Sequence, residues 1–261
     1  MKRIVTSCFL LILLAGGVVF ALDRWSASFI SLVRYGYFSL PSFMERRTVM
    51  IDDRTVSFLL ARFARGEKEW NMATSPSTPK SIHEWRTHLG ADFVVNGSYF
   101  SATGEPTGFY QTPTFESVVA WPDFSNEVKP IGYTFAVWID DGDLDIGYIP
   151  NMTTPPAPNI AAFASFPTLI LNDQPMVEKD SGALARRTML AKDSKESMYV
   201  IVTESGELSL YEAAQWLAAQ PENFTVAGNL DGGPSTGLST AATSWNVEIR
   251  SAAVPNVLTA Q

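Results

Sequence analysis

The sequence predicts a single α+β domain in which a mixed, strand-rich sheet core carries a few short helices. Apolar runs rich in β-branched and aromatic residues recur from Thr48 onward, and turn-forming residues separate them. Two segments in this region carry a helix start signal. No repeat marks a second domain, so residues 48–261 are expected to form one folded unit.

The predicted strands are the short apolar runs of this unit. They are Thr55–Phe58, Phe93–Val95, Phe135–Ile139, Leu144–Ile149, Leu169–Leu171, Thr188–Ala191, Met198–Thr203 and Phe224–Val226. The residues Asp140–Asp143 are typical of a hairpin turn between two of these strands. Asn71–Pro79 is polar and Asn151–Pro158 is proline-rich, so both are expected to be loops.

Two helices are expected between the strands. The first begins near Thr78–Pro79, where Thr suits the cap and Pro the first turn, and it ends at Gly90. The second begins at Ser209, whose spacing to Glu212 forms a capping box, and it runs through Ala219.

The first 21 residues have the features of a secretory signal peptide. Lys2 and Arg3 precede an uncharged apolar run from Ile4 to Leu22, and the residues before position 22 suit a cut after Ala21. The run is also nearly long enough for an uncleaved membrane anchor. Either alternative exports the rest of the chain, which would be periplasmic, extracellular or anchored facing outward. Residues 22–47 are expected to form a tether before the domain.

The composition limits the partners. The chain has 27 acidic and 19 basic residues and a formal net charge of −8, which becomes −10 without Lys2 and Arg3. This balance argues against nucleic acid as a partner and leaves only the N-terminal segment for membrane association. The seven tryptophans could pack in the core or stack against sugar rings, and composition does not separate the two.

The sequence predicts no metal site and no cofactor. The single cysteine, Cys8, lies in the N-terminal segment, so the exported part has no thiolate ligand. His83 and His88 are five residues apart, whereas the zinc-protease helix motif needs four. Five residues turn a helix by about 500°, so the two side chains would point about 140° apart.

Three segments carry candidate chemistry. Val95–Phe100 is the end of an apolar strand followed by Asn96 and Gly97, and Arg186–Thr188 precedes another strand. In Asn229–Ser235 a carboxylate is followed by two glycines and a hydroxyl, a pattern in which backbone N–H groups can turn toward an anion. Taken singly, each is better explained by an ordinary turn or a solvated strand end than by a functional site.

The order of these segments resembles the phosphodiester glycosidase family. Its motifs match Asn96–Phe100, the strand and turn Phe166–Asp173, the pair Arg187–Thr188, and Asn229–Gly233 followed by Ser235. The resemblance covers the region from about Thr48 onward. The chain departs from the family pattern at three positions where glycine is usual, which are Ser98, Asp173 and Pro234.

The resemblance implies hydrolysis of a sugar–phosphodiester bond, without a cofactor, on a sugar phosphodiester or phosphate-containing glycan. Asp231 and Arg187 are the expected catalytic residues, acting on the sugar and the phosphate respectively. The residues expected to bind substrate are Asn96, Gly97, Thr188, Gly232, Gly233 and Ser235. A second carboxylate is left open, with Glu105 and Glu116 as candidates.

Two other classes of function remain open. A non-catalytic binding protein for phosphate-linked polysaccharide would keep Arg187 and the glycine loop without needing Asp231. A structural envelope protein predicts that the three segments lie far apart, whereas an enzyme requires Asn96, Arg187 and Asp231 to converge.

Overall fold

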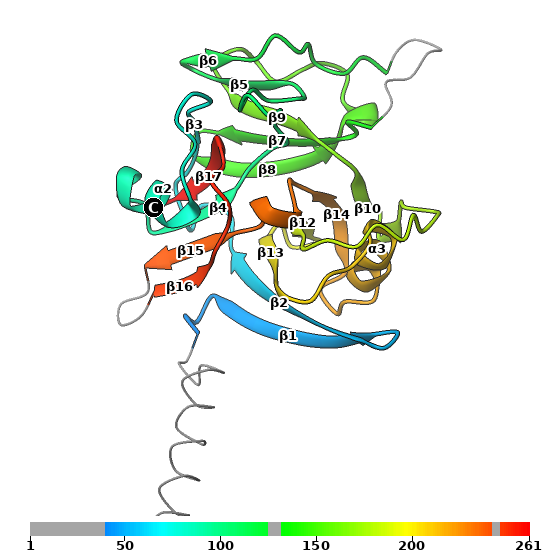
Figure 1. Cartoon of the computed structure of the whole chain (residues 1–261). Coiled ribbons are helices and arrows are strands. Elements are labelled where there is room, and N and C mark those ends of the chain that lie inside the picture. Colours follow the sequence, from blue (N-terminus) through cyan, green and yellow to red (C-terminus); the bar gives the residue numbers. More distant parts are fainter. Residues whose placement is uncertain (1–39, 125–131, 242–245) are drawn as a thin grey trace, which may run out of the picture. The chain divides into compact units, whose positions relative to one another are not determined.

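The computed structural model describes residues 40–124, 132–241 and 246–261 (Figure 1). The predicted signal peptide or anchor (1–21) and the predicted tether up to residue 39 lie outside the described residues. The chain divides into one unit up to Leu40 and a second unit from Pro41 to Gln261, which is the one described below. In the described ranges no helix is both long and apolar enough to cross a membrane.

The second unit is mostly β, so the predicted α+β class is wrong. Three antiparallel sheets make up most of it, and its described part has two α-helices, α2 (Ile82–Leu89) and α3 (Leu210–Ala218). The first sheet has the order β1 (Met44–Ile51), β2 (Arg54–Phe63), β13 (Met198–Ser205), β12 (Thr188–Asp193), β14 (Phe224–Asn229), β10 (Thr168–Leu171) and β11 (Gln174–Pro175). The second has the order β16 (Asn246–Ile249), β15 (Leu238–Ala241), β4 (Phe93–Asn96), β17 (Asn256–Ala260) and β3 (Trp70–Thr74). The third has the order β6 (Phe115–Glu116), β5 (Tyr110–Thr112), β9 (Ala161–Ser165), β7 (Phe135–Asp140) and β8 (Asp143–Tyr148).

The fold class was predicted wrongly because several strands lack the apolar run by which strands are recognised in a sequence. β3 was expected to be part of a polar loop, yet it pairs with β17 along its whole length. β15, β16 and β17 contain Ser, Thr and Asn between their apolar residues and were not predicted. β1 begins at Met44, so residues 44–47 pair with β2 rather than forming a tether. Pairing with a neighbouring strand, which no local pattern reports, decides these segments.

The predicted helices and hairpin are confirmed, with one shift at a boundary. α3 begins after Ser209, which forms the expected capping box with Glu212. α2 has its N-cap at Ser81, slightly later than predicted, and ends at Gly90 in the left-handed region (φ 64°). β7 and β8 are joined by the expected turn.

Three apolar cores hold the described part of the unit together. The largest lies between the seven-stranded sheet and α3, where Phe58 and Trp216 stack with ring centroids 4.0 Å apart. Phe63, Trp70 and Phe93 contact edge to face and join the first two sheets. Trp70, Trp85 and Trp216 are buried, which shows that these tryptophans pack in the core.

Candidate functional site

The candidate site lies where all three sheets meet. β4 ends at Asn96, β12 begins at Thr188, and β14 ends at Asn229 just before the segment 230–237. The third sheet reaches the same place through Ser165, the last residue of β9, whose hydroxyl donates to the carbonyl of Asn229 (2.7 Å). The structure therefore brings the three candidate segments together, although they are far apart in the sequence.

The Asn96 side chain connects these segments and is 1% exposed. Its Nδ2 donates to the carbonyl of Asp231 (2.8 Å). Its Oδ1 accepts from the Thr188 hydroxyl (2.7 Å) and from the N–H of Gly237 (3.1 Å). The Asn96 amide is therefore largely used inside the protein, where it holds the Asp231 segment against β4 and β12.

The backbone around Asp231 is fixed by further contacts. The Asp231 N–H donates to the carbonyl of Gly97 (3.2 Å), and the Gly233 N–H donates to that of Arg186 (2.8 Å). A Cβ on Gly232 would lie 2.8 Å from the Arg186 carbonyl oxygen, closer than real Cβ atoms come, so the close approach requires glycine. The glycine pair brings the Asp231 loop against the segment that carries Arg187.

The Asp231 carboxyl is half-buried, and burial raises its pKa above the ordinary value. Hydrogen bonds from the Ser235 side chain and from the Gly232 N–H (2.9 Å to Oδ1) act in the opposite direction. The N–H groups of Gly232 and Gly233 are thus engaged by the protein itself. An anion at this loop would depend on other donors.

Arg187 is a buried cation without a paired carboxylate. The residue is 8% exposed, and burial lowers its pKa, while Tyr99 and Glu207 act to raise it. In the described part of the chain no Asp or Glu oxygen lies within 4.0 Å of its guanidinium nitrogens. An unpaired buried cation costs folding free energy, so such a group is typical of a site that receives an anion.

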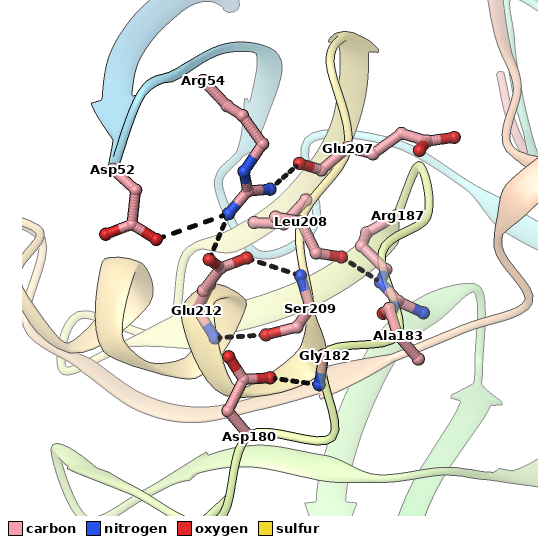
Figure 2. A network of polar contacts seen from close by, with 10 residues as sticks. All are labelled: Asp52, Arg54, Asp180, Gly182, Ala183, Arg187, Glu207, Leu208, Ser209 and Glu212. Carbon is pink, nitrogen blue, oxygen red and sulfur yellow. Dashed lines mark hydrogen bonds and ion pairs between the residues drawn. The ribbon is translucent and has the colours of Figure 1, made fainter.

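Figure 2 shows how the Arg187 side chain is oriented. Its Nε donates to the carbonyl of Leu208 (3.1 Å) and its Nη2 to that of Ala183 (2.8 Å). Leu208 precedes Ser209, the N-cap of α3, so the capping box of that helix anchors one of the two carbonyls. Two backbone acceptors thus aim the guanidinium, and Nη1 forms no hydrogen bond among the described residues.

Tyr99 is a site residue that the sequence analysis did not select. Its hydroxyl donates to the Phe166 carbonyl (3.0 Å) and accepts from Nδ2 of Asn229 (2.6 Å). Burial is the main cause that raises the pKa of Tyr99, the Asp231 carboxylate adds to it, and Arg187 opposes it. The phenol is therefore neutral and lies within electrostatic range of both proposed catalytic side chains. Its place inside the Asn96–Phe100 motif was the available signal.

The described residues do not identify a second carboxylate. Glu105 and Glu116 are exposed, and within the described residues neither side chain forms a hydrogen bond or an ion pair. The groups that shift the pKa of Asp231 include no other acid. Among the described residues the arrangement brings together the carboxyl of Asp231, the guanidinium of Arg187 and the phenol of Tyr99. That set can stabilise positive charge on one side of a bond and negative charge on the other.

Two solved structures share this fold. The catalytic domain of zebrafish N-acetylglucosamine-1-phosphodiester α-N-acetylglucosaminidase, auto-inhibited by its pro-peptide, is 16% identical with a TM-score of 0.57, and the match covers 85% of this chain and 84% of that domain. A hypothetical protein from Synechocystis is 14% identical with a TM-score of 0.52, and the match covers 83% of this chain and 61% of that one. At these identities the likeness concerns the fold.

Sequence comparison supplies the family. No curated protein matches the chain. The sequence model described as phosphodiester glycosidase matches residues 89–260, a region that includes every candidate site residue named above. The chain therefore belongs to the phosphodiester glycosidase family.

Proposed function

We propose that this chain is an exported hydrolase that cleaves the sugar–phosphate bond of a sugar-1-phosphodiester, within an envelope or extracellular glycan. Water is consumed, and a free sugar and a phosphomonoester are released. The name of the zebrafish relative gives a substrate of this class for that enzyme. The observation that carries the proposal is a buried, unpaired arginine held next to the loop of a half-buried aspartate.

Arg187 acts on the phosphate. As the bond between the anomeric carbon and oxygen breaks, the phosphate leaves with the electron pair, and its negative charge grows. A guanidinium fixed in advance by two carbonyls stabilises that charge without reorganising. Because a phosphate is a good leaving group, the reaction places a small demand on a general acid. A site with one described carboxylate suits this chemistry.

Asp231 acts on the sugar, as a nucleophile, as a base or as a stabiliser of the oxocarbenium-like transition state. Each of these roles needs the ionised carboxylate. Asn96, Gly97, Thr188, Gly232, Gly233 and Ser235 complete the proposed site. The contacts above support a positioning role for Asn96 and Thr188, because their side chains bind one another and the Asp231 segment.

Export follows from the N-terminal segment. Residues 1–21 are proposed to be a signal peptide or an anchor, and the glycosidase domain follows the tether. A periplasmic, extracellular or outward-facing membrane-anchored location would give it access to glycans of the envelope. Immunoblotting of cell fractions, with and without a Lys2 and Arg3 double substitution to Asp, tests this part separately.

The activity is tested with p-nitrophenyl sugar-1-phosphates as diester substrates. Cleavage at the sugar yields p-nitrophenyl phosphate, which is colourless until added alkaline phosphatase releases p-nitrophenol. Colour that needs the phosphatase, together with free sugar, supports the proposal. Colour without the phosphatase would mean that the phosphorus–oxygen bond on the far side is cut, which contradicts it.

Asp231→Asn separates the enzyme from a binding protein. The Asn side chain can still accept from the Gly232 N–H and pair with Ser235, so the loop should keep its shape while the charge is lost. We expect kcat to fall by about 10²–10⁴-fold. Affinity should fall little, because a carboxylate near a phosphate is repulsive in the ground state.

The exposed Asp173, changed to Asn, is the matched control and should keep full activity. Asp231→Ala removes both the charge and the two loop hydrogen bonds, from Gly232 and Ser235, so this variant should have a lower Tm. A stable, fully active Asp231→Asn variant would remove this residue from the mechanism. Absence of turnover in the wild-type protein, with retained binding of the diester, would favour the polysaccharide-binding alternative.

A further inference from the structure

Phe166 is an exposed aromatic residue at the candidate site. It lies in the link between β9 and β10 and is 40% exposed, whereas most large apolar residues of the described sheets are buried. Burial of apolar surface stabilises the folded state, and an exposed aromatic ring forgoes part of that free energy. The residue therefore calls for an explanation outside the three cores.

The backbone of Phe166 is fastened to the site. Its carbonyl accepts from the Tyr99 hydroxyl (3.0 Å) and from Nδ2 of Asn229 (3.2 Å). Asn229 is two residues before Asp231, and Tyr99 interacts electrostatically with both Asp231 and Arg187. The ring is thus attached by a short, doubly hydrogen-bonded link to the residues that hold the proposed catalytic groups.

The surroundings of the ring leave part of it open. A Cβ on Gly132 would lie 3.5 Å from Cδ2 of the Phe166 ring, so a glycine without a side chain flanks that edge. The next residue, Tyr133, is half-buried and acts electrostatically on Tyr99. The partly open Phe166 ring thus lies against the segment that leads into Tyr133, while the Phe166 carbonyl binds the Tyr99 hydroxyl.

The same neighbourhood contains an unused polar atom. Asn229 is 0% exposed, and its Oδ1 has no hydrogen-bond partner among the described residues. If Oδ1 and Nδ2 of Asn229 were exchanged, the amide oxygen would face the carbonyl oxygens of Phe166 and Leu230. These two contacts therefore fix the orientation of the amide, with Nδ2 toward the carbonyls. A buried acceptor without a donor is costly unless a ligand or a water supplies one.

This combination matches the chemistry of a pyranose. Such a ring has an apolar face of C–H groups and a rim of hydroxyls that donate hydrogen bonds. Aromatic rings offer a large, rigid apolar surface at low conformational cost. We propose that Phe166 is the platform on which the sugar ring of the substrate stacks.

The inference rests on the proposed function, because it assigns the sugar subsite of that same reaction. It divides the site into two parts, with Phe166 for the sugar and Arg187 for the phosphate. Substitution of Phe166 should therefore change affinity for the sugar part and leave affinity for the phosphate part unchanged.

The test uses Phe166→Ala, Phe166→Leu and Phe166→Trp in the full chain, with Met176→Ala as the control. Met176 is also exposed (37%) but follows the β10–β11 hairpin, and its N–H donates to the carbonyl of Leu169 (2.8 Å). We expect Phe166→Ala to raise KM for the sugar-1-phosphodiester about tenfold, equivalent to about 1.4 kcal/mol, with kcat changed little. Leu should recover part of the affinity and Trp most or all of it.

Competition separates the two subsites. The released monosaccharide should inhibit Phe166→Ala about tenfold more weakly than wild type, whereas inorganic phosphate should inhibit both equally. Thermal melting of each variant shows whether it is folded. A folded Phe166→Ala variant with wild-type KM and unchanged inhibition by the sugar would overturn the inference while leaving the proposed function intact.

Failure of the proposed function is recognised separately. If the wild-type protein turns over no sugar-1-phosphodiester, the fluorescence of Phe166→Trp is compared with that of wild type during titration with the same diesters and monosaccharides. A saturable change specific to the variant would support the stacking platform without the reaction. Identical responses of the two proteins would overturn it.

Discussion

Replacement of Asn96 by Ala should lower the free energy of unfolding by more than the loss of a single hydrogen bond would. The amide makes three hydrogen bonds, to the Asp231 carbonyl, from the Thr188 hydroxyl and from the Gly237 N–H. A hydrogen bond contributes about 1 kcal/mol net, so the three give about 3 kcal/mol. Partners left buried and unpaired would add to this cost.

Thr188→Val is the matched comparison. Valine has the shape of threonine and removes only the hydroxyl that donates to Asn96 Oδ1. The expected loss is about 1 kcal/mol. In the Thr188→Val background, Asn96→Ala should cost less than in the wild-type protein, by roughly the same 1 kcal/mol, because the shared bond has already been removed.

Urea unfolding of the four proteins measures these free energies. A shift of the midpoint at constant m-value reports a change in stability alone. If Asn96→Ala and Thr188→Val lose equal amounts, or if their effects simply add, Asn96 does not join the three segments. In that case its proposed positioning role would have to be abandoned, and a direct contact with substrate would explain the residue better.

Two further predictions concern the charged groups. Arg187→Lys should lower kcat/KM by about 10²–10³-fold, because one ammonium cannot bind both the Ala183 and Leu208 carbonyls and still face a phosphate. Steady-state kinetics on a variant shown to be folded measures this loss. Near-wild-type turnover would mean that the phosphate role is wrong. The acid limb of kcat/KM should lie above pH 4, the approximate pKa of an ordinary aspartate, because burial raises the pKa of Asp231 and the reaction needs its ionised form. Activity should fall as the pH falls through this raised pKa. The acid limb should be absent from the pH profile of the residual activity of Asp231→Asn. An acid limb at or below pH 4 in the wild-type protein would contradict the role given to Asp231. Because the pKa of Asp231 is raised in the folded state, the folded protein loses stability as the pH rises from the ordinary aspartate pKa through the raised one. Asp231→Asn should therefore have a higher Tm than wild type at neutral pH. The difference in Tm should shrink as the pH is lowered.

Much of the site could be predicted because its residues lie in contiguous motifs. Asn96 is the last residue of β4, Arg187 lies just before β12, and Asp231 lies two residues after β14. At such positions the local sequence pattern also marks where the site lies. The contacts within the site could not be predicted in the same way. The expectation that the Gly232–Gly233 backbone binds an anion rests on the pattern of a carboxylate, two glycines and a hydroxyl, whereas the structure shows those N–H groups bonded to Asp231 and Arg186.

Tyr99 and Phe166 show a second limit of the sequence. Nothing in their local pattern separates an aromatic residue at a site from one in a core. Their position depends on hydrogen bonds to Asn229, which is 130 and 63 residues away respectively. The fold class failed for a related reason, since β3 and β17 are strands because they pair with one another and β17 with β4.

The pairing of β17 has a consequence for the timing of folding. β17 lies between β4 and β3, so β3 cannot join the sheet that carries Asn96 until residues 256–260 are available. Thr259 and Asn71, which are hydrogen-bonded across this sheet, are 188 residues apart. Contacts this remote in sequence form slowly, because a long loop must close before they form. A nascent chain that has emerged only in part therefore cannot complete this sheet.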